Sequence, residues 1–203
     1  MMRGLMLTVA LFAVLADAFG QSPDRVWLDS LQVYWDRTNA EYRDPEHSPL
    51  LPEARASFME LERYAPDPNF RVNARFRPKT GKSFGMRTTT DRLPTYQAVG
   101  LLRFELLRRR QRLTVFRNIE LSTRPGFENY LFVPFTDTTN GETTYGGGRY
   151  IDLQGPLEKI VELDMNKAYN PYCAYGGRYS CPIPPKENHL KVPVEAGVKA
   201  FDH

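Results

Sequence analysis

One arginine and several acidic, amide and tyrosine side chains near the C-terminal end of the chain have the types needed to bind a small molecule. Arg149 follows the glycine run Gly146–Gly148, and a guanidinium holds an anion through two parallel hydrogen bonds. Backbone N–H groups beside glycines can approach the same anion. We therefore predict a pocket that binds a small polar or anionic ligand, in which Arg149 is the clamp and the orienting residues are Asp137, Asn170, Tyr175 and Glu187.

Carboxylates in the same region point to a second chemistry. Asp164 and Glu187 are candidates for a general acid or base, a role that needs a carboxyl whose pKa is shifted by its surroundings. The same side chains also suit turns and salt bridges, for example Asp152 or Asp164 pairing with Arg149. Three hypotheses therefore stay open: a binding module, an enzyme with carboxylate chemistry, and a protein in which these motifs are purely structural.

The segment from Asp164 to Asn188 combines two cysteines, four prolines, four tyrosines and three asparagines. This density of asparagine and proline suits neither a helix nor a strand, so we predict an irregular strap over residues 164–189. Cys173 and Cys181 are the only cysteines. In an exported protein they are expected to form a disulfide, which stabilises the fold by about 2.5 kcal/mol for so short a loop.

Neither a metal nor a cofactor is expected. The spacing Cys-x7-Cys-x7-His, which ends at His189, is not a recognised zinc pattern and supplies only three ligands. The glycines at 146–148 lack the Gly-Lys-Ser/Thr signature of a phosphate loop and precede no predicted helix, so a bulge or tight bend is the simpler interpretation.

The elements that must position these residues follow from the hydrophobic spacing. Large apolar residues recur at helical intervals from Trp27 to Tyr42, which predicts an amphipathic helix from Asp24 to about Arg43, followed by a helical turn near 52–59. From Phe70 the period changes to two. This change predicts strands at 70–77, 83–90, 96–106, 113–118, 130–135, around 149–152, 157–164 and 190–197, with the basic run 107–112 as a hairpin tip.

Helices and strands do not alternate along the chain, which argues against a parallel α/β sheet. We predict a mainly β fold, in which an antiparallel sheet forms a small barrel or sandwich with the amphipathic helix at its N-terminal side. Residues 21–203 are expected to form a single domain. Its parts would be a helical region at 22–60, a β region at 66–165, the irregular strap and a final strand at 190–197.

Residues 1–20 have the pattern of a secretory signal peptide. Arg3 precedes an apolar stretch, and small residues permit cleavage before Phe19 or Gln21. A membrane-spanning helix needs about 20 apolar residues, so no transmembrane segment is predicted. We expect an exported protein, periplasmic or secreted. The net charge of +3 and the absence of a recognition motif do not indicate nucleic acid as a partner, and no protein partner is predicted.

Three stretches of the chain, residues 135–152, 163–175 and 180–188, resemble the bacterial family catalogued as domain of unknown function 1684. The resemblance extends upstream through Ser48–Leu50 and Asp67–Val72. It implies a set of shared positions and no reaction, because members of the family are uncharacterised. The chain departs from the family near its C-terminus, where Val198 stands at a position that tends to be glutamate, so an essential acid there is not expected.

Overall fold

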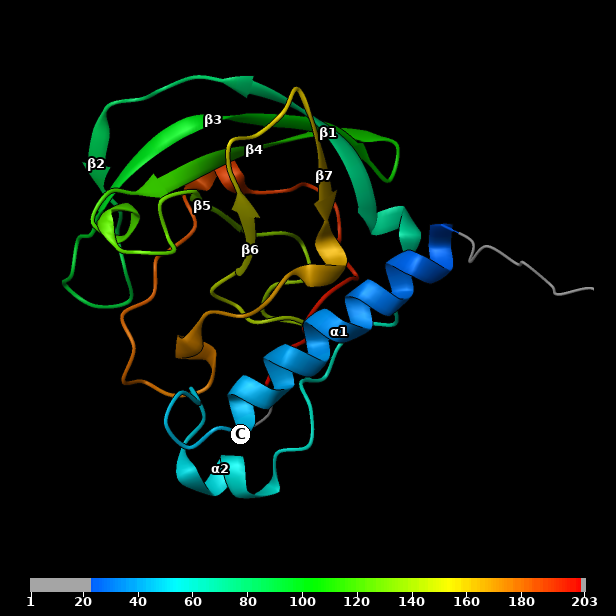
Figure 1. Cartoon of the computed structure of the whole chain (residues 1–203), viewed down its shortest axis with the longest axis vertical. Coiled ribbons are helices and arrows are strands. Elements are labelled where there is room, and N and C mark those ends of the chain that lie inside the picture. The colour runs from blue at the N-terminus through cyan, green and yellow to red at the C-terminus, as the bar shows by residue number, and fades with distance from the viewer. Residues whose placement is uncertain (1–22, 202–203) are drawn as a thin grey trace, which may run out of the picture.

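The computed structural model describes residues 23–201, and the predicted signal peptide lies outside them. Seven strands form one antiparallel sheet with the order β6-β5-β4-β3-β1-β7, and β2 pairs with β3. Figure 1 shows that the sheet curls into a half-barrel. The predicted mainly β, antiparallel fold is confirmed. The strands are β1 (Arg71–Pro78), β2 (Ser83–Gly85), β3 (Thr95–Leu106), β4 (Arg109–Asn118), β5 (Tyr130–Phe135), β6 (Arg149–Gln154) and β7 (Ile160–Asp164).

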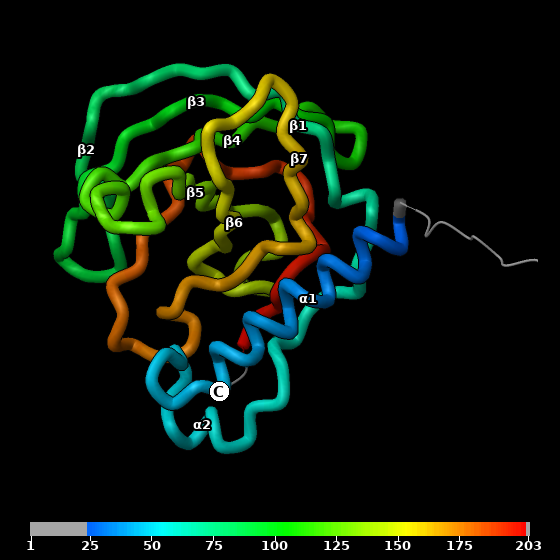
Figure 2. The backbone as a smooth tube through the Cα atoms, viewed as in Figure 1, coloured from blue at the N-terminus to red at the C-terminus, as the bar shows by residue number. Residues whose placement is uncertain are grey.

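Both faces of the sheet carry buried side chains, because successive residues of a strand point to opposite faces. In β5, Leu131 and Val133 enter the main core, while Phe132 joins a second aromatic cluster on the other face. The main core also receives the C-terminal segment, through Leu190 and Val194. Figure 2 follows this segment from the sheet to its end beside α1. The segment is therefore part of the architecture and not a free tail.

Two helices lie to one side of the sheet, α1 (Pro23–Arg43) and α2 (Pro52–Ser57). Trp27, Leu31 and Trp35 of α1 are buried in a third cluster, formed mainly with loop residues. Val26 and Val33 of the same helix are exposed. No helix within residues 23–201 combines the length and apolar character that crossing a membrane requires.

The hairpin of β3 and β4 is tighter than the sequence suggests. Leu107 and Arg108 alone form the turn, and both have positive φ angles, 49° and 59°. Two-residue turns with φ > 0 at both positions match the twist of the flanking strands. The predicted six-residue tip is therefore wrong, and Arg109–Arg112 belong to β4. The predicted strand at 83–90 is likewise shortened to β2.

The predicted final strand at 190–197 is wrong, since these residues form no strand. The alternation behind the prediction is real: Leu190, Val192, Val194 and Ala196 are buried, and the residues between them are exposed. The carbonyls of Val194 and Ala196 instead accept hydrogen bonds from a buried arginine side chain. Alternating burial therefore does not require pairing with a neighbouring strand.

We predict that Gly197→Ala will lower the free energy of unfolding by at least about 2 kcal/mol more than Gly141→Ala. Both glycines have positive φ, 76° and 85°, so both variants carry backbone strain. A Cβ at Gly197 would lie 2.4 Å from the carbonyl oxygen of Ala168, whereas nothing lies within 4 Å at Gly141. Urea denaturation measures the difference, and equal losses would contradict the tight packing of the C-terminal segment.

Candidate functional site

A cleft of about 630 Å³ lies between α1, the sheet and the strap. Eight of the eleven tyrosines of the chain line it. We call it the tyrosine cleft. Its lining comprises Tyr34, Arg37, Thr38, Glu41, Tyr42, Tyr96, Tyr130, Phe132, Tyr150, Asp152, Gln154, Tyr169, Pro171, Tyr172, Tyr179, Ser180, Cys181 and Pro182.

Strand periodicity positions the floor of the cleft. Phe132 of β5 lies directly opposite Asp152 of β6, so both side chains project from the same face. Tyr130 and Tyr150 lie two residues before them on their strands and share that face. The residues between, such as Leu131 and Ile151, enter the main core on the opposite face. The aromatic floor is thus the reverse side of a well-packed sheet.

Helix periodicity positions one wall. Tyr34, Arg37, Thr38 and Glu41 are spaced by three, one and three residues, so they share one stripe of α1. Arg37 Nε lies 3.4 Å from a carboxylate oxygen of Glu41 in an exposed pair. The two charges at this rim therefore largely offset each other.

The strap supplies the opposite wall, and a disulfide between Cys173 and Cys181 constrains it, as predicted. Tyr172 immediately precedes Cys173, and Tyr179 lies within the loop that this bond closes. Their rings meet edge to face with centroids 5.2 Å apart. Tyr169 approaches Tyr150 of the floor in the same manner at 5.8 Å. Such edge-to-face contacts hold aromatic rings in defined orientations, so the walls are largely preformed.

Asp152 is the distinctive group of the floor. Its Oδ1 atom accepts hydrogen bonds from the hydroxyls of Tyr130 and Tyr169, at 2.7 and 2.8 Å. Within residues 23–201, no cationic side chain forms an ion pair with this carboxylate. Asp152 is nevertheless exposed to water through the open cleft. One of its oxygens is therefore held by the protein, and the other is available to a ligand.

The surroundings of Asp152 shift its titration. The surrounding protein displaces part of the water around the carboxylate and raises its pKa, although the two tyrosine hydroxyls act in the opposite direction. Removal from water, followed by the negative charge of Asp152, raises the pKa of Tyr169 and Tyr130 well above the ordinary value. Both tyrosines therefore stay protonated at neutral pH and remain hydrogen-bond donors to Asp152.

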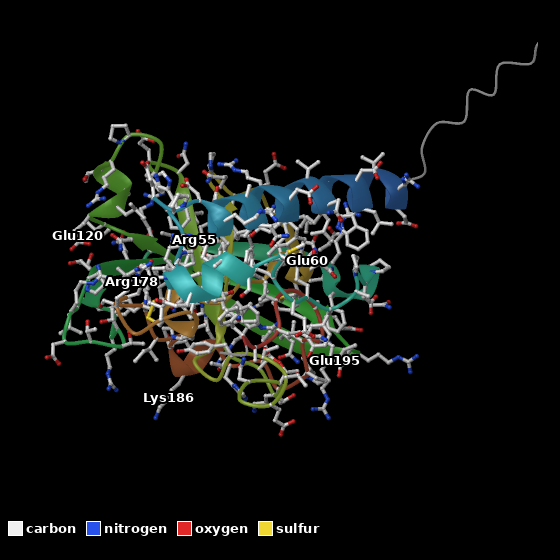
Figure 3. All side chains as sticks on the ribbon, turned by 90° about the horizontal axis from the view of Figure 1, so that it is seen from below. Arg55, Glu60, Glu120, Arg178, Lys186 and Glu195 are labelled. Carbon is white, nitrogen blue, oxygen red and sulfur yellow. A yellow bond between two sulfur atoms is a disulfide. The ribbon has the colours of Figure 1, made fainter. Side chains whose placement is uncertain are left out.

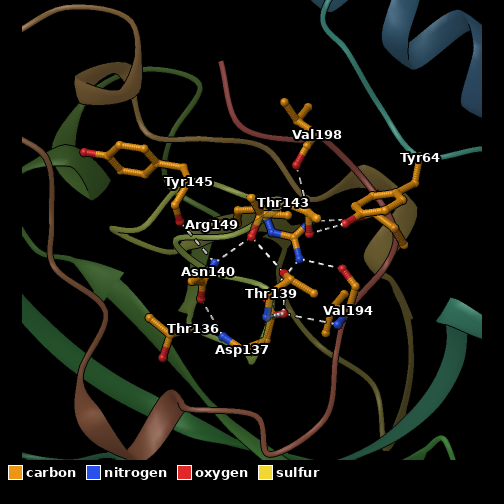
Figure 4. Close-up of polar contacts among 12 residues, drawn as sticks. Tyr64, Thr136, Asp137, Thr139, Asn140, Thr143, Tyr145, Arg149, Val194 and Val198 are labelled. Atoms are coloured by element: carbon orange, nitrogen blue, oxygen red, sulfur yellow. Dashed lines mark hydrogen bonds and ion pairs between the residues drawn. The ribbon is translucent and has the colours of Figure 1, made fainter. Parts of the chain in front are cut away.

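The structure brings together Arg149 and Asp137, two of the sequence-predicted site residues, but buries both away from the cleft (Figure 4). Arg149 Nη2 lies 2.9 Å from an oxygen of Asp137, and neither side chain is exposed. The remaining hydrogen bonds of the guanidinium go to the carbonyl oxygens of Val194, Ala196 and Val198. Burial lowers the pKa of Arg149, against the attraction of Asp137.

The Asp137 carboxylate likewise accepts hydrogen bonds only from groups inside the protein. One of its oxygens accepts hydrogen bonds from the backbone N–H and the hydroxyl of Thr139, and from the backbone N–H of Val194. The pair thus ties the loop that follows β5, the first residue of β6 and the C-terminal segment together. Its contacts are those of a structural frame. The Nε atom of Arg149 has no hydrogen-bond partner, but it is buried and does not line the cleft.

The other predicted site residues lie in separate places. The Asp164 carboxylate accepts hydrogen bonds from Trp27 Nε1, at 2.8 Å, and from Asn166, so it anchors α1 to the sheet. Asn170 is fully buried and donates to the carbonyl of Lys199. Tyr175 is buried beside Asn170, and burial raises its pKa to about 12. Glu187 is exposed on the short turn η5 (Lys186–Asn188), whose Lys186 lies at the edge of the molecule in Figure 3.

None of these six predicted residues lines the tyrosine cleft. Asp152 and its partners Tyr130 and Tyr169 were not among the predicted site residues. The sequence did contain a signal for this site. Tyr130 and Phe132 are two residues apart on one strand, and Tyr150 and Asp152 are two residues apart on the next, so each pair places its side chains on one face of its strand. No group of three or more histidine, cysteine, aspartate or glutamate side chains stands close enough to hold a metal ion within the described part of the chain.

Fold and site together define a curled antiparallel β protein with an open, tyrosine-walled cleft. The family model of DUF1684, described as protein of unknown function, matches residues 56–199, and the chain therefore belongs to this family. The match includes the floor and the strap but not α1, which supplies the remaining wall. No curated protein matches the chain.

The fold is also similar to that of an uncharacterised protein of Haloarcula marismortui, whose structure was solved by solution NMR. The two chains share 36% sequence identity and superpose with a TM-score of 0.68. The similarity covers 87% of this chain and 95% of the other. The overall fold thus recurs in this archaeal protein.

We predict that Arg149→Met will lower the free energy of unfolding by about 3–5 kcal/mol, because it leaves the Asp137 carboxylate and three carbonyls buried without their partner. Lys199→Met is the control. It breaks an ion pair with Glu62 that is exposed to water, and such pairs contribute about 1 kcal/mol or less. Chemical denaturation of both variants measures the effect. Similar losses would contradict the role of Arg149 as a frame.

We predict that Asp152→Asn will be more stable than the parent protein at neutral pH, and that this gain will disappear near pH 3. The pKa of Asp152 is raised on folding from its ordinary value of 3.8, so the folded state holds this proton more tightly than the unfolded state. The stability that protonated Asp152 contributes is present below pH 3.8 and is lost as the pH rises through the higher pKa that Asp152 has in the folded state.

Urea denaturation of both proteins from pH 3 to pH 8 tests this prediction. Asp91→Asn, which changes an exposed loop carboxylate, serves as the control for a simple loss of charge. A gain for Asp152→Asn that does not depend on pH, or no gain at any pH, would contradict the proposed environment of the carboxylate.

Proposed function

We propose that the protein binds a small polar ligand in the tyrosine cleft, and that the ligand donates a hydrogen bond, preferably from a protonated amine, to Asp152. The observation that carries the proposal is a carboxylate held by two tyrosines, exposed to water in the cleft and without a cationic partner within residues 23–201. A ligand cation would supply the charge that the protein does not.

The size and chemistry of the walls support this proposal. Small-molecule pockets typically measure about 300–1,000 Å³ and combine apolar walls with a few placed polar groups. The cleft falls within that range. Aromatic faces attract cations through the negative charge of their π systems, and tyrosine rings line every side of the cleft. Both the floor and the walls therefore favour an ammonium group.

An anionic ligand, which the sequence also suggested, is less well supported. The predicted anion clamp, Arg149, is fully buried, and both terminal nitrogens of its guanidinium are hydrogen-bonded to internal groups. Arg37 lies in the cleft but pairs with Glu41. The unpaired charge that faces the cleft is the negative charge of Asp152, which repels anions.

Matched small molecules test the proposal. Benzylamine, benzyl alcohol and benzoate share one ring and differ in charge, and each can be titrated against the protein while tyrosine fluorescence and ligand NMR signals are followed. We predict that benzylamine will bind most tightly. Asp152→Asn will weaken its binding by roughly tenfold to a hundredfold, which is the range for a hydrogen bond to a charged group.

Glu41→Gln is the control variant, because it removes a second carboxylate that lines the same cleft but already has a cationic partner. Its affinity for benzylamine should stay within a few-fold of the parent protein. Equal binding of the three compounds, or an equal loss in the two variants, would contradict the proposed role of Asp152.

A second candidate function is catalysis with Asp152 as a general acid or base. The raised pKa of this carboxyl favours it, because a group that titrates nearer neutral pH transfers protons more effectively. The two functions differ in whether the ligand is returned unchanged. NMR spectra of amine-containing compounds incubated with the protein and with Asp152→Asn distinguish them, since only catalysis yields a product that depends on Asp152.

A further inference from the structure

The register of three neighbouring strands places three arginines in one row on the sheet. Arg75 of β1 lies opposite Arg103 of β3, and Arg103 lies opposite Arg112 of β4. All three are exposed, and the residues that flank them on their strands, such as Phe76 and Leu102, enter the main core. Adjacent strands are about 4.8 Å apart, so the three Cα atoms span only about 10 Å. We call these residues the arginine row.

The charge of the arginine row is not balanced by the protein. None of its three guanidinium groups forms an ion pair within residues 23–201. Two acids lie diagonal to the row in the register. Glu105, opposite Arg110, forms no ion pair within residues 23–201, and Glu162, opposite Asn73, pairs with Arg71. Like charges directly opposite each other on a sheet are destabilising. An external anionic partner would relieve this repulsion.

One exposed apolar side chain borders the row, and another lies at the tip of the β3–β4 hairpin. Ile160 of β7 lies opposite Arg75 and is 50% exposed, and Leu107 at the hairpin tip is 45% exposed. The row itself contains no aromatic side chain on which nucleic acid bases could stack. Phosphate charge above an apolar interior is the chemistry of a lipid bilayer, and basic side chains next to apolar ones are typical of proteins that lie on its surface.

We propose that the arginine row docks this face of the sheet onto an anionic lipid bilayer surface. In Figure 1, β1, β3 and β4 arch over the side of the molecule away from α2. The row shares no residue with the tyrosine cleft, so the two proposals are independent. The protein would bind at the surface through charge and would not insert a helix.

Sedimentation with vesicles tests the proposal. The parent protein should bind vesicles made of equal parts phosphatidylglycerol and phosphatidylcholine, should not bind phosphatidylcholine alone, and should be released by added salt. The variant with Arg75→Gln, Arg103→Gln and Arg112→Gln should bind roughly 100-fold more weakly, since each basic residue near such a surface contributes about a fivefold change in affinity.

A second triple variant, Arg87→Gln, Arg124→Gln and Lys186→Gln, is the matched control, because it removes the same charge from exposed positions outside the row. It should keep binding within about tenfold of the parent protein. Thermal unfolding should leave the arginine-row variant as stable as the parent or more stable, because its substitutions remove like-charge repulsion.

Three outcomes would overturn the proposal. The parent protein could fail to bind the anionic vesicles. The two triple variants could lose affinity equally, in which case net charge alone acts. Heparin could bind the arginine row as tightly as the vesicles do and displace the protein from them, in which case the partner is a soluble polyanion.

Discussion

A single buried guanidinium holds the irregular C-terminal segment of this protein to its sheet. Arg149 begins β6 and reaches the carbonyls of Val194, Ala196 and Val198, while Asp137 compensates its charge. Carbonyls removed from water need donors, and a chain that forms no ladder with the sheet cannot obtain them from a neighbouring strand. One planar side chain with several donors supplies them. The C-terminal segment can therefore pack its apolar side chains into the core without being a strand.

The need to satisfy buried backbone groups distinguishes the structural motifs from the candidate site. The polar residues that are densest in the sequence mostly satisfy buried backbone: Asn188 bonds both backbone groups of Thr114, and Asn166 bonds both the N–H and the carbonyl of Asp67. Their side-chain amides are therefore occupied by contacts within the protein. The cleft instead depends on tyrosines, which present a large apolar ring and a hydroxyl that reaches one carboxylate. Asp152 keeps a free oxygen because the residues around it donate to the other.

The two proposed surfaces use opposite charges on one chain whose net charge is only +3. The tyrosine cleft presents an acid without a cation, and the arginine row presents cations without an acid. Each is set by the register of adjacent strands, which brings Phe132 opposite Asp152 and Arg103 opposite Arg112. A sheet places residues that are far apart in sequence next to each other, at the fixed distance between strands. Unpaired charges on its surface can therefore lie close together.

The sequence by itself determined much of the local structure of this protein. The strand predicted from Tyr130 to Phe135 is β5 with its observed bounds, the helical spacing predicted α1 within one residue, and the cysteine pair predicted the disulfide. Only the tertiary structure decided which side chains meet. Arg149 finds its carbonyl partners between 45 and 49 residues away, and Asp152 meets Tyr169 through an irregular strap. Periodicity gives the face on which a residue lies, but the path of a segment without periodicity follows from packing and from the need to satisfy buried polar groups.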